Sequence, residues 1–354
     1  MPIPTEPIGS IPRPTQLVNA VRELQAGRLK QERLSAIYDE ALRDTILRFE
    51  ATGSPVISDG EQTKPSFATY PIHGLANLAP DGVTVPFADG HTRRLPRLTS
   101  GPFRYKTYAS SYLQVAKQYA TVPVKQAVIS ASLLSLLYPS EGIEGYSQDR
   151  FLDDLIKEAV ADIRQCLDAG ACKVQIDFTE ARLSLKLDPS GGLLANFIGL
   201  NNRVLSHFSG AERQIIGVHT CPGGDQDATH SADVDYAGLL PSLFQLQAGN
   251  FYVQLASEAD RPRVLRLLRD HSRQEQRVFV GVTDPINPRI ESAQDVRDRV
   301  LEAAEFIPRD RLGTTDDCGF SPFGDDTSTA RDTAFEKIKA RVIGTELASK
   351  ELGK

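Results

Sequence analysis

The sequence predicts an α/β protein with the (β/α)8 TIM barrel fold, and two observations carry this prediction. Short β-rich runs alternate with amphipathic helical segments along most of the 354 residues, and eight such β-then-α units can be counted. A doubly wound open sheet is the alternative, but it would normally show a glycine-rich phosphate loop after an early strand, and the sequence has none. We therefore expect residues 1–354 to form a single (β/α)8 barrel.

The eight expected strands follow one another along the chain. The first lies in EPIGSIP near the N-terminus. The others are SPVISDGE (54–61), VPVKQAVIS (122–130), CKVQIDF (172–178), QIIGVHT (214–220), FYVQLAS (251–257), VFVGVTD (278–284) and RLGTTDD (311–317). Between the second and third units, residues 74–109 break the rhythm with Pro, Gly and alternating valines, so we expect a surface β-hairpin insertion there.

The helical segments show the expected period and end signals. Residues 16–50 carry apolar residues at helical spacing with charges on the other face. A later helix ends in LDAG, where Gly170 suits a C-cap, and SAQDVRDRVLEAAEFI begins at Ser292, which suits an N-cap. Helices of this kind are expected to cover the outside of the barrel.

Composition narrows the function classes. The chain is 40% hydrophobic and 24% charged, which is typical of a soluble globular protein, and its net charge of −6 argues against nucleic acid or an anionic membrane as the main partner. No apolar run reaches the length of a membrane span, and the N-terminus lacks the features of a signal peptide. We expect a cytoplasmic protein that acts on small molecules; a homo-oligomer is left open.

The barrel prediction directs attention to the residues just after each strand, because active sites of such barrels gather at the C-terminal ends of the strands. These positions hold Ile8, Gly9, Ser10, Asp59, Glu61, Asp177, Glu180, His219, Cys221, Gln254, Glu258, Asp284, Asp316, Asp317 and Cys318. The predicted mouth is therefore acidic, with one histidine and two cysteines.

The stretch GVHTCPGGD, residues 217–225, suggests a metal site. His219 and Cys221 are two apart on a strand and point to the same side, and Cys318 follows another strand of the same ring. Two cysteines and one histidine are a known catalytic zinc set, which leaves a fourth position for substrate. The alternative is a plain strand end whose histidine makes a local hydrogen bond. Cys166 and Cys172 are interpreted as packing residues.

Six motifs together resemble the cobalamin-independent methionine synthases, specifically their C-terminal catalytic barrel and its stand-alone relatives. They are PIGSIPRP, ISDGEQ, KVQIDFTEARL, GVHTCPGGD, GVTDPINPRIESAQDV and LGTTDDCGF, in the family's order and over nearly the whole chain. The pattern of His-x-Cys with a distant Cys is also similar to that of the epoxyalkane:coenzyme M transferases. Both groups use a zinc-bound substrate thiolate as the nucleophile, so the resemblance implies Zn²⁺ as the cofactor.

The resemblance also implies roles for individual residues. His219, Cys221 and Cys318 would be the zinc ligands. Glu61 and Asp177 would hold a substrate ammonium, and the turn at Ile8, Gly9 and Ser10 would offer backbone N–H groups to a carboxylate. This constellation matches homocysteine.

A second interpretation of Glu61 and Asp177 is an internal salt bridge with Lys64 or Arg182. It would leave the two carboxylates with a structural role instead of a substrate.

Two departures limit what the family implies. Where many relatives have a fourth, glutamate zinc ligand, this chain has Gln254, with Glu258 as one substitute. Where methionine synthases have a histidine that protonates the folate leaving nitrogen, this chain has Ile286, which cannot act as an acid. The N-terminal half of the full-length enzyme, which helps to bind folate, also has no counterpart here.

We therefore expect zinc-dependent transfer of a methyl or alkyl group to the sulfur of a small thiol, with homocysteine first among the thiols. The donor is expected to be a methylated corrinoid or a strained ring, with 5-methyltetrahydrofolate used slowly or not at all. Asp284 is the expected acid for a departing oxygen, unless His230 or Tyr70 replaces it.

Two other functions stay open. One is addition of a coenzyme M-like thiol to an epoxide, and a thiol without an ammonium group would distinguish it. The other is a non-catalytic zinc-holding or thiol-sensing protein, which a coordination sphere closed by four protein ligands would favour.

Overall fold

The computed structural model describes residues 2–353, and a six-stranded parallel sheet forms its centre. Its strand order is β12-β11-β10-β7-β6-β5. The strands are β5 (Gln126–Ile129), β6 (Val174–Asp177), β7 (Ile216–Thr220), β10 (Asn250–Val253), β11 (Arg277–Thr283) and β12 (Leu312–Asp316). All six start and end inside, or within one residue of, the ranges predicted from the sequence.

The first two predicted strands are reduced to single bridges, which corrects the expectation of eight full strands. Thr5 pairs with Thr314 of β12, and Ile57 pairs with Val124 just before β5, both in parallel. Prolines explain the reduction of the first strand, because a proline has no N–H to donate to a ladder and MPIPTEPIGSIPRP is rich in them. The second segment leaves the extended conformation at Gly60 and Glu61, whose φ values are +63° and +55°. The Ile11 N–H donates to the Gly60 carbonyl at 3.0 Å and so joins the two bridge segments to each other. The sheet is therefore connected all the way round.

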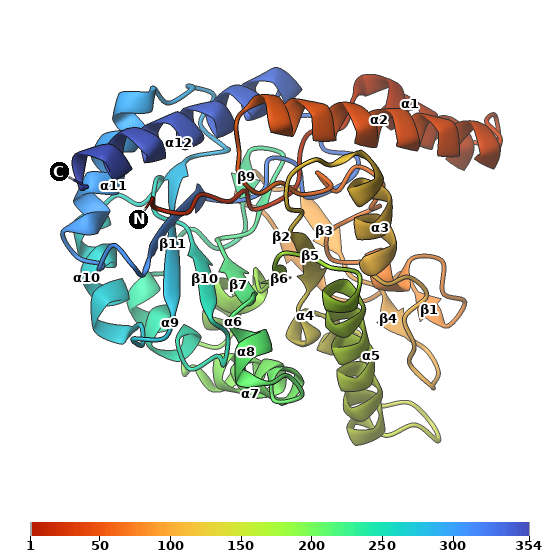
Figure 1. Cartoon of the computed structure of the whole chain (residues 1–354). Coiled ribbons are helices and arrows are strands. Elements are labelled where there is room, and N and C mark those ends of the chain that lie inside the picture. Colours follow the sequence, from red (N-terminus) through yellow and green to blue (C-terminus); the bar gives the residue numbers. More distant parts are fainter. Residues whose placement is uncertain (1, 354) are drawn as a thin grey trace.

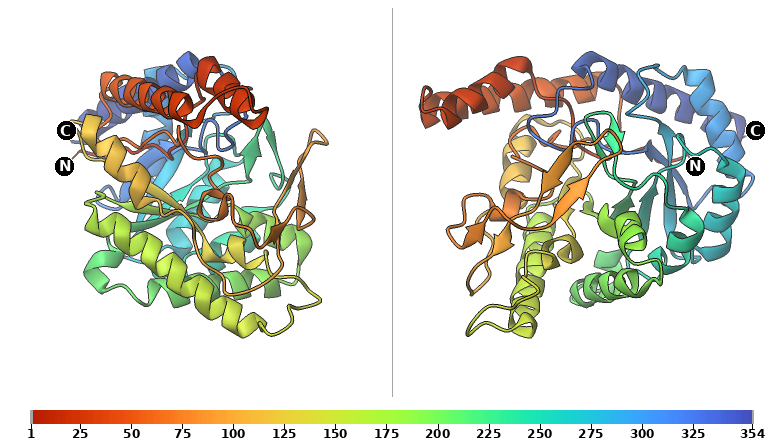
Figure 2. Two further views of the ribbon diagram at one scale, coloured as in Figure 1. Left: turned by 90° about the vertical axis from the view of Figure 1, so that its right-hand side faces the viewer. Right: turned by 180° about the vertical axis from the view of Figure 1, so that it is seen from behind.

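Helices surround the strands in all three views (Figures 1 and 2). They are α1 (Thr15–Gln25), α2 (Gln31–Ala51), α3 (Ser110–Tyr119), α4 (Ala131–Ser135), α5 (Gln148–Asp168), α6 (Glu180–Leu187), α7 (Gly192–Leu205), α8 (Gly210–Arg213), α9 (Tyr236–Leu243), α10 (Arg261–His271), α11 (Ala293–Ala304) and α12 (Arg331–Glu351). A short 3-10 helix covers Tyr70–Ile72. Among the described residues, no helix is both long enough and apolar enough to cross a membrane.

Both predicted helix ends are confirmed. The Ser292 hydroxyl accepts a hydrogen bond from the Asp295 N–H at 3.1 Å, and the Asp295 carboxylate accepts one from the Ser292 N–H at 2.9 Å, which forms a capping box at the start of α11. Gly170, just past α5, has a φ of +78°, the left-handed conformation that favours glycine at a helix end. The caps fix where each helix leaves the barrel wall.

The segment after the second unit contains two short antiparallel pairs. β1 (Leu78–Ala79) pairs with β4 (Arg97–Leu98), and β2 (Thr84–Pro86) pairs with β3 (Thr92–Arg94). We call residues 84–94, from the start of β2 to the end of β3, the β2–β3 hairpin.

The β2–β3 hairpin is fastened to the loops after β7 and β12 by one side chain. Arg93 forms ion pairs with Asp225 and Asp325, and Asp225 is fully buried. A buried carboxylate needs such a partner, because an unpaired charge away from water is unfavourable. The hairpin is therefore held over these two loops.

The interior near the first bridge is polar as well as apolar. Glu6 lies 2.6 Å from Lys173 Nζ and 3.6 Å from Lys125 Nζ, and it accepts a hydrogen bond from the Tyr252 hydroxyl. The two lysines hold the pKa of Glu6 below its usual value against the opposing effect of burial. The charges of Glu6 and the two lysines compensate one another, so we assign this layer of the barrel interior a structural role.

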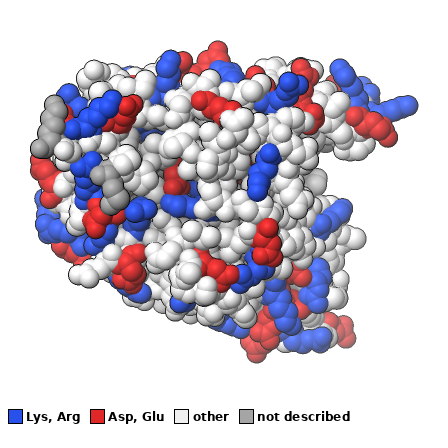
Figure 3. Space-filling model, viewed as in Figure 1, with Lys and Arg blue, Asp and Glu red and all other residues white. Residues whose placement is uncertain are grey.

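The outer surface carries both signs of charge. On the face in Figure 3, Lys and Arg side chains are interspersed with Asp and Glu. That face has no broad patch of a single sign, in keeping with small-molecule substrates.

Candidate active site

One histidine and two cysteines meet at the mouth of the barrel. β7 carries His219 and ends just before Cys221, while Cys318 follows the end of β12. Their possible ligand atoms all lie within 4.8 Å of one another. The sulfurs of Cys221 and Cys318 are 3.2 Å apart, and both cysteines are free.

The unsatisfied atoms of this group fit a metal ion. His219 is 2% exposed; its Nδ1 lies 3.3 Å from the Tyr252 carbonyl, while its buried Nε2 has no partner among the described residues. A metal-binding histidine typically gives its other ring N–H to a carbonyl in this way. The hydrogen bond from Cys221 lowers the pKa of Cys318 well below its usual value and raises that of Cys221. One imidazole and two sulfurs suit Zn²⁺.

The predicted substrate residues lie beside this group. A small cavity of about 30 Å³ has His219 and Cys318 in its wall together with Ile8, Ser10, Glu61 and Asp177. Neither the Gly9 nor the Ser10 N–H donates a hydrogen bond within the described part of the chain. The turn therefore keeps two donors that suit an anionic group.

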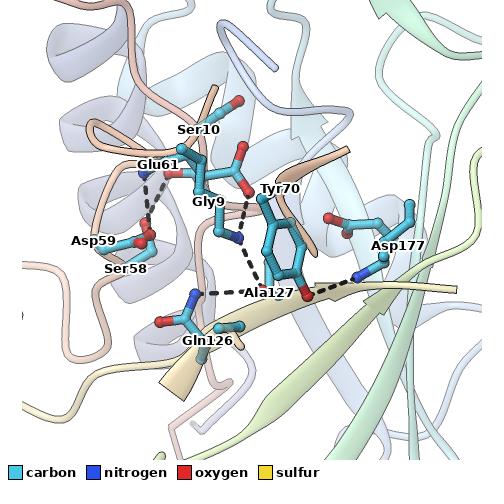
Figure 4. A network of polar contacts seen from close by, with 12 residues as sticks. Gly9, Ser10, Ser58, Asp59, Glu61, Tyr70, Gln126, Ala127 and Asp177 are labelled. Carbon is cyan, nitrogen blue, oxygen red and sulfur yellow. Dashed lines mark hydrogen bonds and ion pairs between the residues drawn. The ribbon is translucent and has the colours of Figure 1, made fainter. Parts of the chain in front are cut away.

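Glu61 is engaged in an internal ion pair, as the second interpretation of the sequence anticipated. Lys64 Nζ lies 3.1 Å from Glu61 Oε1 and also donates to the Ala127 carbonyl at 2.9 Å (Figure 4). Burial raises the pKa of Glu61 to about 6, whereas Glu61, Asp59 and Asp177 together raise the pKa of Lys64 despite its burial. The charge that Glu61 offers is therefore already met by a lysine.

Glu61 also has an unusual backbone. Its φ is +55°, in the left-handed region that non-glycine residues rarely adopt. The buried Arg13 guanidinium donates to the carbonyls of Glu61, at 2.6 Å, and Lys64, at 3.2 Å. Arg13 thus holds the loop in the conformation that brings Glu61 into the cavity.

Asp177, at the end of β6, forms no ion pair with a lysine or arginine among residues 2–353. One of its oxygens accepts a hydrogen bond from Gln175 Nε2 at 2.7 Å, and burial raises its pKa. Arg182, the other cation considered from the sequence, instead contacts Glu258 at 3.2 Å and Gln254 at 3.0 Å. Neither Gln254 nor Glu258 belongs to the group of His219 and the two cysteines.

The three residues considered as acids lie in different places. Asp284 is in the wall of neither cavity described here and accepts a hydrogen bond from the Ile286 N–H at 3.0 Å. Tyr70 donates its hydroxyl to the buried Asp162. His230 faces a larger cavity, and burial lowers its pKa to about 4, so its ring is neutral at neutral pH.

That larger cavity has a volume of about 640 Å³ and adjoins the small one. Phe67, Thr179, Gly223 and Gly224 belong to both walls. Apolar residues of α1 and of the β2–β3 hairpin cover it, among them Leu17, Val21, Val85 and Phe87. The two cavities therefore lie side by side at the mouth of the barrel.

Lys64 and Glu180 also line the larger cavity. Neither residue was predicted from the sequence to bind substrate or to take part in catalysis. Lys64 was considered only as a salt-bridge partner, and Glu180 only as a residue near a strand end. Their positions in GEQTK and DFTE, directly after two strands, are the signal that could have singled them out.

A parallel barrel with a His-Cys-Cys group at its mouth is the architecture of a metal-dependent enzyme. The chain belongs to the family described as "Cobalamin-independent synthase, Catalytic domain", whose model matches residues 3–334. It is an enzyme of that family.

Individual relatives are distant but cover the chain. The methionine synthase of Sulfurisphaera tokodaii is 22% identical over 353 residues, which is 99% of this chain and 94% of that protein. A B12-independent methionine synthase from Shewanella sp. W3-18-1, solved in complex with selenomethionine, gives a TM-score of 0.78 at 21% identity, with 99% of both chains covered. A putative vitamin-B12 independent methionine synthase from Listeria monocytogenes gives 0.72, also at 21% identity, with 99% of this chain and 98% of that chain covered. These similarities establish the barrel fold.

Proposed function

We propose that the chain transfers a methyl or alkyl group to the sulfur of a small thiol, with a zinc ion held by His219, Cys221 and Cys318. The observation that carries this proposal is the position of His219 and Cys318 in the wall of the same cavity as Ser10 and Asp177. A zinc ion bound there would lower the pKa of a substrate thiol, so that its sulfur attacks carbon as a thiolate. The protein's other residues bind and orient the two substrates.

The sizes of the two cavities support two adjoining subsites. At about 30 Å³ the small cavity is too small for a whole thiol substrate, so we assign it to the sulfur end of the thiol. The rest of the thiol and the alkyl donor would extend across Thr179 and Gly223 into the larger cavity. The free N–H groups of Gly9 and Ser10 would bind an anionic group of the thiol.

Homocysteine is supported as the thiol by the family, whose relatives are named methionine synthase. Its ammonium group would lie against Asp177, which pairs with no lysine or arginine in the described part of the chain. Homocysteine would also have to share Glu61 with Lys64.

A thiol that carries only an anionic group is the second candidate, and the Lys64–Glu61 ion pair favours it. Such a thiol, with a sulfonate like that of coenzyme M, needs no carboxylate for an ammonium and gains from the cation of Lys64. Its donor would be an epoxide. Ile286, in the place of the family's histidine acid, is also better suited to this candidate than to folate chemistry.

A non-catalytic zinc-holding role has less support. Among the residues that the structure describes, the candidate group has three members, whereas structural zinc sites are closed by four protein ligands.

The test combines metal analysis with a substrate screen. Zinc-loaded protein is incubated with homocysteine or 2-mercaptoethanesulfonate and with methylcobalamin, 1,2-epoxypropane or 5-methyltetrahydrofolate, and thioether formation is measured. Turnover of a thiol with any donor supports the proposal. Protein that binds no zinc, or zinc-loaded protein that forms no thioether, contradicts it.

A further inference from the structure

The carboxyl group of Glu180 lies in the wall of the larger cavity and forms no ion pair within residues 2–353. Glu180, the first residue of α6, is 1% exposed. Its Oε1 accepts hydrogen bonds from the hydroxyls of Ser130, at 2.6 Å, and Ser132. Its Oε2 is buried and has no hydrogen-bond partner within the described chain. Such an atom calls for a ligand or a proton.

The two serines determine which oxygen carries the proton. An oxygen that already accepts two hydroxyl hydrogen bonds is the poorer site for a further proton, so a protonated Glu180 carries it on Oε2. Burial raises the pKa of Glu180 to about 7, with a smaller contribution from the charge of Asp177. Near neutral pH a substantial fraction of the molecules therefore carry a proton on the carboxyl group of this wall residue.

The surroundings of Glu180 indicate what the proton is for. The cavity has apolar cover from α1 and the β2–β3 hairpin, and Thr179, next to Glu180 in sequence, belongs to the wall shared with the small cavity. A molecule in the larger cavity therefore has Glu180 in one part of its wall and the residues shared with the sulfur subsite in another. We infer that Glu180 is the general acid that protonates the leaving atom of a neutral, largely apolar alkyl donor bound in the larger cavity.

This inference rests on the proposed function, and its bonds and protons balance. The thiol loses its proton when it becomes a thiolate. Its sulfur then forms a bond to the donor carbon as the bond from that carbon to oxygen breaks, and the oxygen takes the proton from Glu180 Oε2. Glu180 is left as a carboxylate that keeps the hydrogen bonds of Ser130 and Ser132, and one proton from solvent restores it. The net reaction adds the thiol across the carbon–oxygen bond of a strained ring without another reactant.

The other acids considered are less suited to this step. Tyr70 donates its proton to Asp162, and Asp284 lies in the wall of neither cavity. His230 shares the cavity wall with Glu180, but its lowered pKa leaves the ring neutral. Glu180 alone among them combines a cavity position with a raised pKa.

The experiment compares two donors that differ in their need for an acid. 1,2-Epoxypropane leaves an alkoxide that must be protonated, whereas iodomethane releases iodide, which needs no proton. Zinc-loaded wild-type protein and Glu180→Gln are assayed with each donor and with the thiol that the wild type uses, after subtraction of the uncatalysed reaction. Glu158→Gln is the matched control, because Glu158 is also buried and bonded to a hydroxyl but lies in neither cavity wall.

We expect Glu180→Gln to slow the epoxide reaction by a hundredfold to ten-thousandfold, the usual contribution of a positioned acid, and to leave the iodomethane reaction within about threefold. Equal loss with both donors, or no loss with either, overturns the inference. Wild-type turnover of iodomethane but not of the epoxide also overturns it, while the proposed function stands. If the wild type uses neither donor with either thiol, the inference fails, and the proposed function fails with it only when methylcobalamin and 5-methyltetrahydrofolate give no thioether either.

A readout without zinc or substrate completes the test. The infrared carbonyl band of a protonated carboxylic acid should disappear as the pH of the metal-free protein rises through about 7. We expect this loss of the carbonyl band in the wild type and in Glu158→Gln. In Glu180→Gln the part of the band that titrates at about pH 7 because of Glu180 should be missing. A Glu180 that titrates near 4.5, the ordinary value for the side chain, would have no proton to give at neutral pH and would overturn the inference.

Discussion

Lys64 Nζ lies 3.1 Å from Glu61 Oε1 at the mouth of the barrel, and the two side chains are only 1% and 3% exposed. The lysine thus occupies the place at Glu61 that a substrate ammonium would take. The choice between a thiol with an ammonium group and a thiol without one therefore depends on Lys64.

Substitution of Lys64 should change the preference between thiols. In Lys64→Met the carboxylate of Glu61 loses its ion-pair partner. Binding of a thiol with an ammonium group should therefore become stronger, and binding of an anionic thiol should become weaker. We expect the ratio of kcat/KM for homocysteine to that for 2-mercaptoethanesulfonate to rise by about tenfold or more, or about 1.4 kcal/mol. Lys30→Met, at an exposed position, should leave the ratio unchanged. An unchanged ratio in a folded Lys64→Met protein would show that Lys64 does not face the thiol.

Metal content should depend on the sulfurs at the mouth. The wild type should bind about one zinc per chain, and Cys318→Ala should lose both the metal and alkyl transfer, because three donors would be reduced to two. Cys172→Ala is the matched control, since that thiol lies at the start of β6, outside the group. Metal analysis after dialysis checks both variants, and full retention of zinc by Cys318→Ala would contradict the ligand set.

Asp177→Asn should weaken the binding of a thiol that has an amine more than the binding of a thiol that has none. If Asp177 pairs with an ammonium, removal of its charge should weaken homocysteine binding by a few kcal/mol while zinc stays bound. Binding of 2-mercaptoethanesulfonate should change little. Calorimetric titration with each thiol provides the measurement. An equal loss of affinity for both thiols would show that Asp177 does not bind the amine.

The stability of the metal-free protein should fall with rising pH because of Glu180. Its pKa is raised in the folded state from 4.5 to about 7, so the folded state binds the proton more tightly than the unfolded state does. The stabilisation is fully present below about pH 4.5 and is lost as the pH rises through about 7, by roughly 3 kcal/mol for a shift of this size.

The variant Glu180→Gln distinguishes the contribution of Glu180 to the pH dependence of stability from the contributions of other buried carboxyl groups, such as those of Asp162 and Asp317. Glu180→Gln should lose less stability than the wild type between pH 5 and pH 8.5 in denaturant unfolding. Parallel curves for the two proteins would mean that Glu180 is not protonated in the folded state.

The choice of donor should follow from Ile286. Folate nitrogen is a poor leaving group without protonation, and the side chain in the place of the family's histidine cannot supply a proton. We expect 5-methyltetrahydrofolate to be used at least a hundredfold more slowly than the best donor of the screen. Steady-state assays with each donor in turn decide this, and rapid turnover with 5-methyltetrahydrofolate would assign the acid to another group.

Local patterns predicted much of the fold. Six strands and two helix ends were readable because hydrophobic alternation, Ser292 and Gly170 act on their immediate neighbours. The first two strands were overestimated, because prolines remove ladder donors from the first and the second turns at Gly60 and Glu61, which leaves one bridge each. The predicted helical run at 16–50 is divided at Gly27, whose φ is +71°, into α1 and α2.

The candidate site was predictable where it depends on strand ends and unpredictable where it depends on long-range pairs. The convergence of His219, Cys221 and Cys318 follows from the barrel itself. The large cavity does not, because α1 and the β2–β3 hairpin come together over it only in three dimensions. Spacing alone also cannot choose between a lysine and a substrate as the partner of Glu61.

The Arg93 ion pairs link the cover of the large cavity to the loops that carry both sulfurs. Asp225 follows Cys221 in one loop, Asp325 follows Cys318 in the other, and the same guanidinium contacts both aspartates. The hairpin and the two sulfur-bearing loops are therefore crosslinked into one mechanical unit. A displacement of the hairpin large enough to admit a bulky molecule would have to break these ion pairs or move the two loops with it.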